Sequence, residues 1–337
     1  MFIRIVMDIT VRSSIAIAGI VFNVLNMVIF STLGLKDSMS VGLFSLSFTD
    51  FLITCFQLAS SVCYIVDLLY PTSPIDAVAV GYFVFGFLIN TTYLLSCWIT
   101  AMISVERCVC VASPFKVKQI FTRHRSIISV LITFIAYILL NGLVYSIYKM
   151  EWQHYNGSTT EYNFTETPPA YILTVRIRKE AEYLEIIFDI SVRTCSPFLS
   201  QAIVLVCAVW IRYSLNASSK IRRHISDLPS GVVQQRQTSV DSKSSSRLSR
   251  RERKLVKVVL YLGIILTVCN LPRAISTAVC HTLPGMDPGI KDNLNTTLWV
   301  TVSAIGSVGC TVNSFVYFSL NKKYKKQCCQ IFRLPCK

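Results

Sequence analysis

The sequence predicts an all-α membrane protein, a bundle of seven transmembrane helices followed by a short amphipathic helix on the membrane surface. Hydrophobic residues make up 53% of the chain and charged residues only 15%, whereas ordinary soluble domains carry roughly 25% charged residues. Seven apolar windows are also long enough to cross a bilayer, which takes about 20 helical residues. These windows are 14–35, 39–66, 78–110, 126–148, 183–211, 254–280 and 294–319.

The basic residues indicate how the chain is oriented. With the N-terminus outside, 23 of the 33 Lys and Arg residues fall in cytosolic segments and 7 in outside segments, as the positive-inside rule requires. The glycosylation sequons at Asn156, Asn163 and Asn295 then lie outside, whereas those at Asn90 and Asn216 do not. We therefore expect a multi-pass plasma-membrane protein with a cytosolic C-terminus. Because the net charge of +15 gathers at one membrane face, it does not indicate nucleic-acid binding.

Composition divides the chain into three parts. Residues 1–13 are expected to be an extracellular N-terminus, and residues 14–319 to form the membrane domain, whose first span is a signal anchor. Within this domain, the Ser-rich basic segment 213–253 predicts a flexible cytosolic loop. Residues 320–337 alternate basic and apolar side chains, which favours a helix lying on anionic membrane lipids over a solvated tail.

The 13 cysteines show no spacing typical of a metal site. Cys328 and Cys329 follow the last span and are placed for palmitoylation. Cys63 and Cys280 lie near the outer ends of their spans, and the sequence leaves open whether they form a disulfide. No set of His, Cys and carboxylate residues converges within the spans, so we expect neither an enzyme nor a bound cofactor.

A motif at the end of the third window gives the first functional indication. Glu106-Arg107-Cys108 closes this apolar run, and Pro114-Phe115 follows in the next loop. Charges at such a border are costly unless they are paired or functional. This motif resembles the one that ends the third helix of rhodopsin-like (class A) G protein-coupled receptors. Together with the polar and proline residues described next, it makes the chain similar to that family over essentially residues 14–332. Within that family, the chain is most similar to divergent invertebrate chemosensory-type or peptide-type orphan receptors.

The resemblance implies a polar cluster around Asp50, a carboxylate deep in the second window. A buried carboxylate must be hydrogen-bonded, ion-paired or protonated. By resemblance, its partners are Asn23, Ser96 and Asn313, around a site where many members of the family hold sodium. A sodium site and a structural polar network both remain open.

The resemblance also implies an activation switch. Pro272 bends the sixth helix, and Asn313 and Tyr317 are the polar residues of the seventh-span motif. Glu252 matches the position that pairs with Arg107 at the inner end of the sixth helix. An agonist that favours outward movement of this helix would open a cytosolic cleft for a heterotrimeric G protein.

Charged residues in the outer halves of the spans are candidates for ligand binding. Asp189 and Arg193 are four residues apart and share one helix face, so they can neutralise each other. Arg273 would bind a carboxylate of an acidic small molecule or of a peptide C-terminus; alternatively, it pairs internally with Asp189 or extends toward solvent. Further candidate lining residues are Tyr93, Gln57, Trp299 and Ser303.

The chain departs from the family pattern at several positions. Gly309 and Asn270 stand where an Asn and a Trp are expected, and no proline follows Asn313. No cysteine lies near Tyr82 or within 149–182, so the family's usual disulfide at this place is absent. No Ser or Thr follows position 319, so kinases and arrestin would have to act through the third cytosolic loop.

The competing interpretation is a membrane transporter or channel with a receptor-like seven-helix fold. Such a protein would show internal repeats, paired broken helices and ionisable residues near the midplane. The sequence has no evident repeat, and Asp50 is already accounted for by the receptor pattern.

Overall fold

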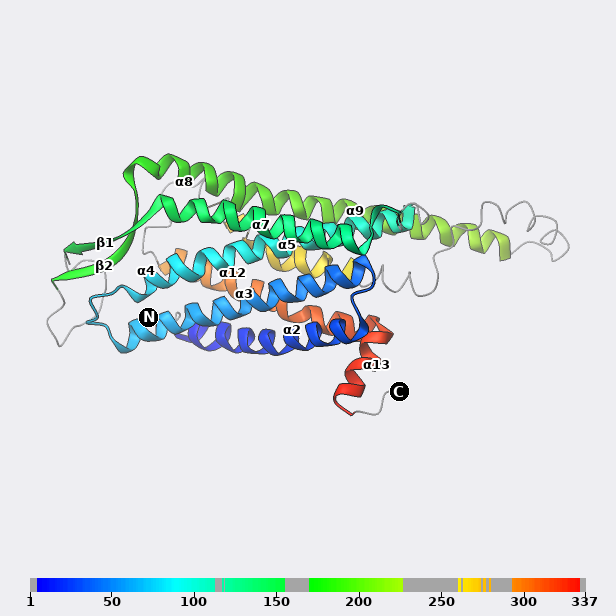
Figure 1. Cartoon of the computed structure of the whole chain (residues 1–337), viewed down its shortest axis with the longest axis horizontal. Helices are drawn as coiled ribbons and strands as arrows, with labels where there is room; N and C mark the ends of the chain where they lie inside the picture. The colour runs from blue at the N-terminus through cyan, green and yellow to red at the C-terminus, as the bar shows by residue number, and fades with distance from the viewer. Residues whose placement is uncertain are drawn as a thin grey trace.

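The computed structural model describes residues 5–112, 117, 119–154, 170–226, 260–261, 263–273, 275–276, 279 and 293–333. Among these residues, six helices are long and apolar enough to cross a membrane. They run side by side along the long axis of the molecule (Figure 1). Of the sixth window, residues 260–261, 263–273, 275–276 and 279 are described, and all of them are helical. The protein is the expected seven-helix bundle with a short final helix.

The elements follow the predicted windows closely. The first half contains η1 (Ile5–Arg12), α2 (Ser13–Leu33), α3 (Ser38–Leu69), α4 (Ala77–Gly81), η2 (Tyr82–Gly86) and α5 (Phe87–Ala112). The second half contains α7 (Arg123–Ile147), β1 (Tyr148–His154), β2 (Tyr171–Ile177), η3 (Lys179–Ala181), α8 (Glu182–Phe188), η4 (Asp189–Cys195), α9 (Ser196–Ser226), α12 (Asn293–Leu320) and α13 (Lys322–Ile331). The two strands lie at one end of the bundle and α13 lies at the other (Figure 1). We call these the hairpin end and the α13 end.

The first helix begins earlier than the window at residue 14 predicts. Residues Ile5–Arg12 continue α2 as π-helix, and Arg12, expected in the N-terminal segment, is only 7% exposed. Its guanidinium donates to the hydroxyls of Ser60 and Ser61 at 3.5 and 3.2 Å and lies 5.7 Å from the ring centre of Tyr64. These partners on α3 offset the cost of burying the charge.

A two-stranded antiparallel sheet forms between the fourth and fifth spans, where the sequence indicates no strand. Tyr148 pairs with Ile177 at one end of the ladder and His154 with Tyr171 at the other. At its exposed edge, the hydrogen bond from Lys149 lowers the pKa of Glu151. Pairing with this neighbouring cation favours the charged form of the carboxyl group.

Backbone hydrogen bonds join the hairpin to the loop between α3 and α4. The Leu173 amide donates to the Pro74 carbonyl at 2.7 Å, and the Asp76 amide donates to the Leu173 carbonyl at 3.0 Å. This connection lies in the region where the resemblance would place a disulfide, which the sequence of residues 149–182 excludes.

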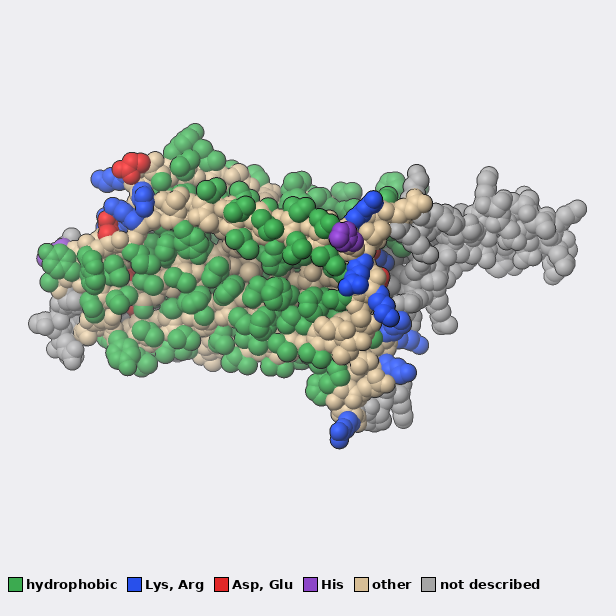
Figure 2. All heavy atoms as spheres, in the orientation of Figure 1, with side chains coloured by type: hydrophobic (Ala, Val, Ile, Leu, Met, Phe, Trp, Pro, Cys, Tyr) green, Lys and Arg blue, Asp and Glu red, His purple; other side chains and the backbone are tan. Residues whose placement is uncertain are grey.

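The bundle packs around α5, which contacts α3, α7 and α9. At the α13 end, a cluster of buried side chains joins α2, α3, α5, α12 and α13, whereas an aromatic cluster fills the hairpin end. The face of the bundle seen in Figure 2 is apolar along most of its length. Such surfaces are expected of helices that face lipid.

Candidate functional site

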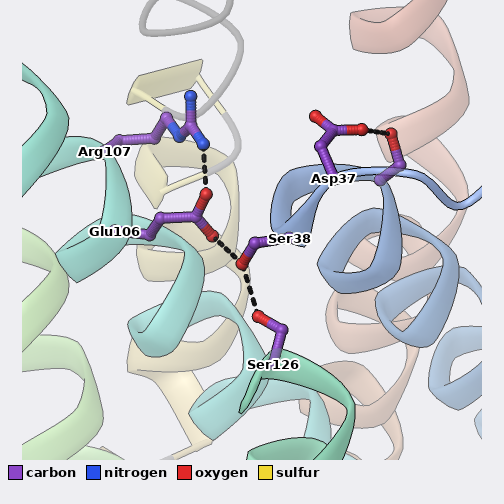
Figure 3. Close-up of polar contacts among 6 residues, drawn as sticks. Asp37, Ser38, Glu106, Arg107 and Ser126 are labelled. Carbon is purple, nitrogen blue, oxygen red and sulfur yellow. Dashed lines mark hydrogen bonds and ion pairs between the residues drawn. The ribbon is translucent and has the colours of Figure 1, made fainter. Parts of the chain in front are cut away.

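Glu106 is the centre of a polar junction at the α13 end (Figure 3). It lies near the end of α5, is 6% exposed and pairs with Arg107 beside it. Ser38, the first residue of α3, donates a hydrogen bond to Glu106 at 2.7 Å. Ser38 also contacts Ser126 on α7, and since its own hydrogen goes to Glu106, Ser126 must be the donor. The junction therefore joins the ends of three helices through one carboxylate.

Arg107 is buried together with Glu106, with 7% of its surface exposed. Its Nε has no hydrogen-bond partner within the described residues. Three other predicted members of the switch, Pro114, Phe115 and Glu252, lie outside those residues, whereas Pro272, Asn313 and Tyr317 lie within them.

Asp50 occupies a fully packed position in α3, with 1% of its surface exposed. Ser96 on α5 donates to one carboxylate oxygen at 2.9 Å, and Asn313 on α12 donates to the other at 2.7 Å. The structure thus brings together three of the four residues that the resemblance places in this cluster.

Asn23, the fourth, lies in an adjoining network. It donates to the Cys310 carbonyl on α12 at 3.2 Å and accepts from Asn26 at 3.3 Å. Asn26 also donates to the hydroxyl of Ser314 at 2.9 Å and accepts from the hydroxyl of Tyr324 at 2.5 Å. This second network links α2, α12 and α13.

The residues around Asp50 do not fit a sodium ion well. Both carboxylate oxygens already accept hydrogen bonds from protein donors. Gly309, where the family has Asn, provides no side-chain oxygen for an ion. A Cβ at this position would lie 2.9 Å from the Cβ of Cys269, so glycine permits close approach of the sixth and seventh helices. The arrangement favours a structural polar network. No group of three or more His, Cys, Asp or Glu residues that could hold a metal occurs in the described part of the chain.

The sixth helix contacts α5 through residues that replace the family pattern. Asn270, at the position of the expected Trp, is 6% exposed and donates to the sulfur of Cys97 at 3.7 Å. Pro272 lies within the helical stretch 263–273. At the seventh-span motif, Tyr317 is fully buried, and its ring packs against Phe30 with centroids 5.2 Å apart.

Asp189 and Arg193 form the ion pair that their spacing predicts, with Nη1 and Oδ1 2.6 Å apart. The guanidinium also lies over the rings of Phe87 and Phe188, at 4.9 and 5.6 Å from their centres. An aromatic and anionic surrounding of this kind stabilises a buried cation. Arg193 is therefore accounted for by structural contacts.

Arg273 turns toward α5. Its guanidinium lies 4.4 Å from the ring centre of Tyr93 and donates to the side-chain oxygen of Asn90 at 3.4 Å. Arg273 is half-buried, whereas Asn90 and Tyr93 are buried, with 8% and 7% of their surface exposed. The amide nitrogen of Asn90 has no hydrogen-bond partner among the described residues.

The remaining candidate lining residues lie on α3 and α12. Gln57 is buried and accepts a hydrogen bond from Ser307 at 2.8 Å, which engages it in contact between these helices. Trp299 and Ser303 are half-buried on α12.

Modification sites are described only in part. Cys328 and Cys329 are 8% and 6% exposed, so their thiols face the protein in this conformation. Cys63 is a free thiol, and Cys280 lies outside the described residues. The same holds for Asn156 and Asn163, and nothing is described of the side chain of Asn295.

The structure adds five residues to those predicted from the sequence: Ser38, Ser126, Asn26, Ser314 and Tyr324. Ser314 was detectable as the residue that replaces the seventh-span proline. An Asn three residues after Asn23 shares its helix face, which was a signal for Asn26. Nothing in the local sequence distinguishes Ser38 or Ser126 from other serines at helix ends.

Comparison with protein families adds an independent finding. The family model described as "7 transmembrane receptor (rhodopsin family)" matches residues 23–317. A comparison with curated proteins finds no match. The matched segment begins at Asn23 and ends at Tyr317, so it includes the junction at Glu106, the network at Asp50 and the ion pair on η4. This protein therefore belongs to the rhodopsin family of seven-transmembrane receptors.

Proposed function

We propose that this protein is a G protein-coupled receptor that binds an extracellular ligand at the hairpin end and activates a heterotrimeric G protein at the α13 end. Residues 14–319 would form the receptor domain, with the α13 end in the cytosol, as the distribution of Lys and Arg favours. The observation that carries the proposal is the buried Glu106–Arg107 pair at the end of α5.

The junction supplies a mechanism for holding the resting state. Ser38 and Glu106 keep one side of the Arg107 guanidinium in place, while its Nε remains available to a further acceptor. Glu252 is our candidate for that acceptor, which would connect the sixth helix to α5. An agonist that binds better when the sixth helix has moved outward would shift the population toward that state and expose the cleft.

The test is basal and ligand-stimulated G protein activation in cells expressing the native chain, Glu252→Ala or Arg107→Ala. Losing a hydrogen bond to a charged group costs about 1.5–3 kcal/mol, so Glu252→Ala should raise the ratio of active to resting receptor roughly tenfold or more. Arg107→Ala should change the extent to which agonist activates the G protein. The control is Arg253→Ala, which alters a neighbouring charge. Variants indistinguishable from native at equal surface expression would contradict the proposal.

For the ligand, we propose an acidic small molecule, as in chemosensory receptors, or a peptide with a free C-terminus. Arg273 is held on the face of Tyr93, and the amide nitrogen of Asn90 beside it offers a second donor. A carboxylate can accept from both groups, and Arg suits bidentate recognition of this kind.

Paired ligands test this assignment, because each acid or free C-terminal peptide can be compared with its amide. Arg273→Ala should lower the potency of the acid about tenfold or more, since a charged hydrogen bond is lost, while the amide changes little. Arg178→Ala removes a cation from the hairpin region and serves as the control. Equal potency of the acid on native and Arg273→Ala receptors would exclude the role of Arg273.

Regulation is proposed for the third loop. In the segment 213–253, Ser239 lies three residues after Arg236 and Ser249 lies next to Arg250. Phosphorylation there would add charges for arrestin to recognise. Replacing the Ser and Thr residues of this loop should slow desensitisation, measured as the decay of signalling under constant agonist. Normal decay would refute this route.

A further inference from the structure

A half-open cavity of about 540 Å³ lies between α3, α5 and α7 at the α13 end. This volume is within the range of roughly 300–1,000 Å³ that is typical of small-molecule pockets. Most of its wall is apolar. The apolar side chains include Ile99, Met102, Ile103, Ile128, Val130 and Ile203.

Apart from Ser129, the hydroxyl-bearing and charged residues that line the cavity lie at one end. Ser38, Glu106 and Ser126, which form the junction in Figure 3, line it there. Arg125 also contributes to this end. Its Nη1 donates to the Gln119 carbonyl at 2.7 Å, which fixes the exposed guanidinium at the rim of the cavity.

The long axis of the cavity follows α5. Its lining residues on this helix extend from Trp98 to Glu106, which corresponds to roughly 12 Å at 1.5 Å per residue. The apolar wall therefore runs along this spanning helix, and Arg125 lies near the end of the span that begins at Arg123. Figure 2 shows further Lys and Arg side chains gathered at this end of the viewed face.

We propose that this cavity binds a membrane lipid with an anionic headgroup. One acyl chain lies along the apolar wall of α5, and the headgroup accepts hydrogen bonds from Arg125. The cation at the rim and the apolar wall together match this amphiphile, whereas the apolar wall does not match a soluble polar ligand. The proposed orientation places the α13 end in the cytoplasmic leaflet, where anionic lipids are concentrated. Lipid binding does not itself require that the chain activate a G protein.

Lipid retention tests the proposal directly. The full chain is reconstituted in bilayers of equal amounts of phosphatidylcholine and phosphatidylglycerol, extracted in mild detergent, and its retained lipids are quantified by mass spectrometry. We expect the native chain to retain more phosphatidylglycerol than phosphatidylcholine. Arg125→Gln should lower that preference about fivefold, which corresponds to ~1 kcal/mol per basic residue. Ser129→Phe, which fills the cavity from α7, should lower retention of both lipids.

Matched controls separate this site from general lipid contact. Arg123→Gln removes a neighbouring cation that does not line the cavity, and Ile132→Phe adds a ring on the exposed face of α7. Both should retain lipid like the native chain. An equal loss of the preference for phosphatidylglycerol in Arg123→Gln and Arg125→Gln would show a diffuse attraction to the surface. Unchanged lipid retention in Ser129→Phe would show that the lipid binds elsewhere. Either result overturns the proposal. Because retention is measured without G protein, failure here leaves the proposed function standing.

Discussion

At the scale of single residues, Asp50 shows how a carboxylate is accommodated in a membrane helix. Its two oxygens accept from Ser96 and Asn313, so both neighbouring helices contribute a donor. Removing the acceptor would leave two buried donors without partners, which costs more than removing both sides of a hydrogen bond.

Asp50→Ala should therefore destabilise the purified protein by about 1–3 kcal/mol, because buried donors are left unsatisfied. Asp50→Asn should cost less, since the amide oxygen still accepts. The measurement is the thermal unfolding midpoint in detergent. Ser104→Ala is the control, because its hydroxyl donates to the Thr100 carbonyl of its own helix. An Asp50→Ala protein as stable as the native one would show that the network is not structural.

Only some of the residues around Glu106 can be predicted from the sequence. Glu106 and Arg107 stand out because two charges end an apolar run. Ser38 is 68 positions away from Glu106, and the sequence carries no signal that these two side chains meet. Contacts between distant helices depend on how the helices rotate about their axes, and hydropathy alone does not determine that rotation.

At the scale of elements, α13 is attached to the bundle more firmly than an amphipathic surface helix requires. Tyr324 is 1% exposed, packs against Tyr317 with ring centroids 5.8 Å apart and donates to Asn26 on α2. Burial raises the pKa of its hydroxyl group, so the group keeps its proton and remains a donor at any physiological pH. Cys328 is buried in the same cluster.

Tyr324→Phe should loosen α13, because it removes one hydrogen bond worth about 0.5–1.5 kcal/mol while keeping the aromatic packing. We expect faster maleimide labelling of Cys328 and Cys329, and more palmitate on them in cells, since both thiols must leave the protein surface to react. Peptide mass spectrometry measures both. Tyr261→Phe, at an exposed position on the sixth helix, is the control. Labelling at the native rate would mean that this hydrogen bond does not hold α13 in place.

Helix ends and connections were harder to predict than the spans. Hydropathy places the fourth span to within three residues of α7, because the bilayer imposes its length. It gives no signal for the hairpin, whose strands are short and only partly alternate, or for the π-helical turns of η4. The latter end just before Pro197, which has no N–H to donate and so interrupts the regular α-helical pattern.

At the scale of the whole molecule, the distribution of charge predicts its direction across the membrane. The hairpin end and the α13 end differ in shape (Figure 1), and the Lys and Arg residues favour a cytosolic α13 end. Glycosylation reports this direction, because glycans are added only to segments that face the lumen of the secretory pathway.

Treatment with a peptide N-glycosidase should increase the electrophoretic mobility of the chain made in eukaryotic cells. Replacing Asn156, Asn163 and Asn295 with Gln should abolish that change. Asn216→Gln is the matched control, because its sequon lies on the opposite side in the proposed orientation. A glycan that depends on Asn216 would reverse the orientation and, with it, the proposed faces for ligand and G protein.

The hairpin is attached to its neighbouring loop by hydrogen bonds and not by a covalent bond, so this attachment is reversible. Two backbone hydrogen bonds join Leu173 to Pro74 and Asp76, and each contributes only about 0.5–1.5 kcal/mol. This contact between the hairpin and the loop can therefore break and re-form without any chemical reaction, within the nanoseconds to microseconds typical of loop motion. If the ligand binds at this end, as proposed, bulky ligands would enter while the contact is broken. Thiol reductants should leave this part of the fold intact.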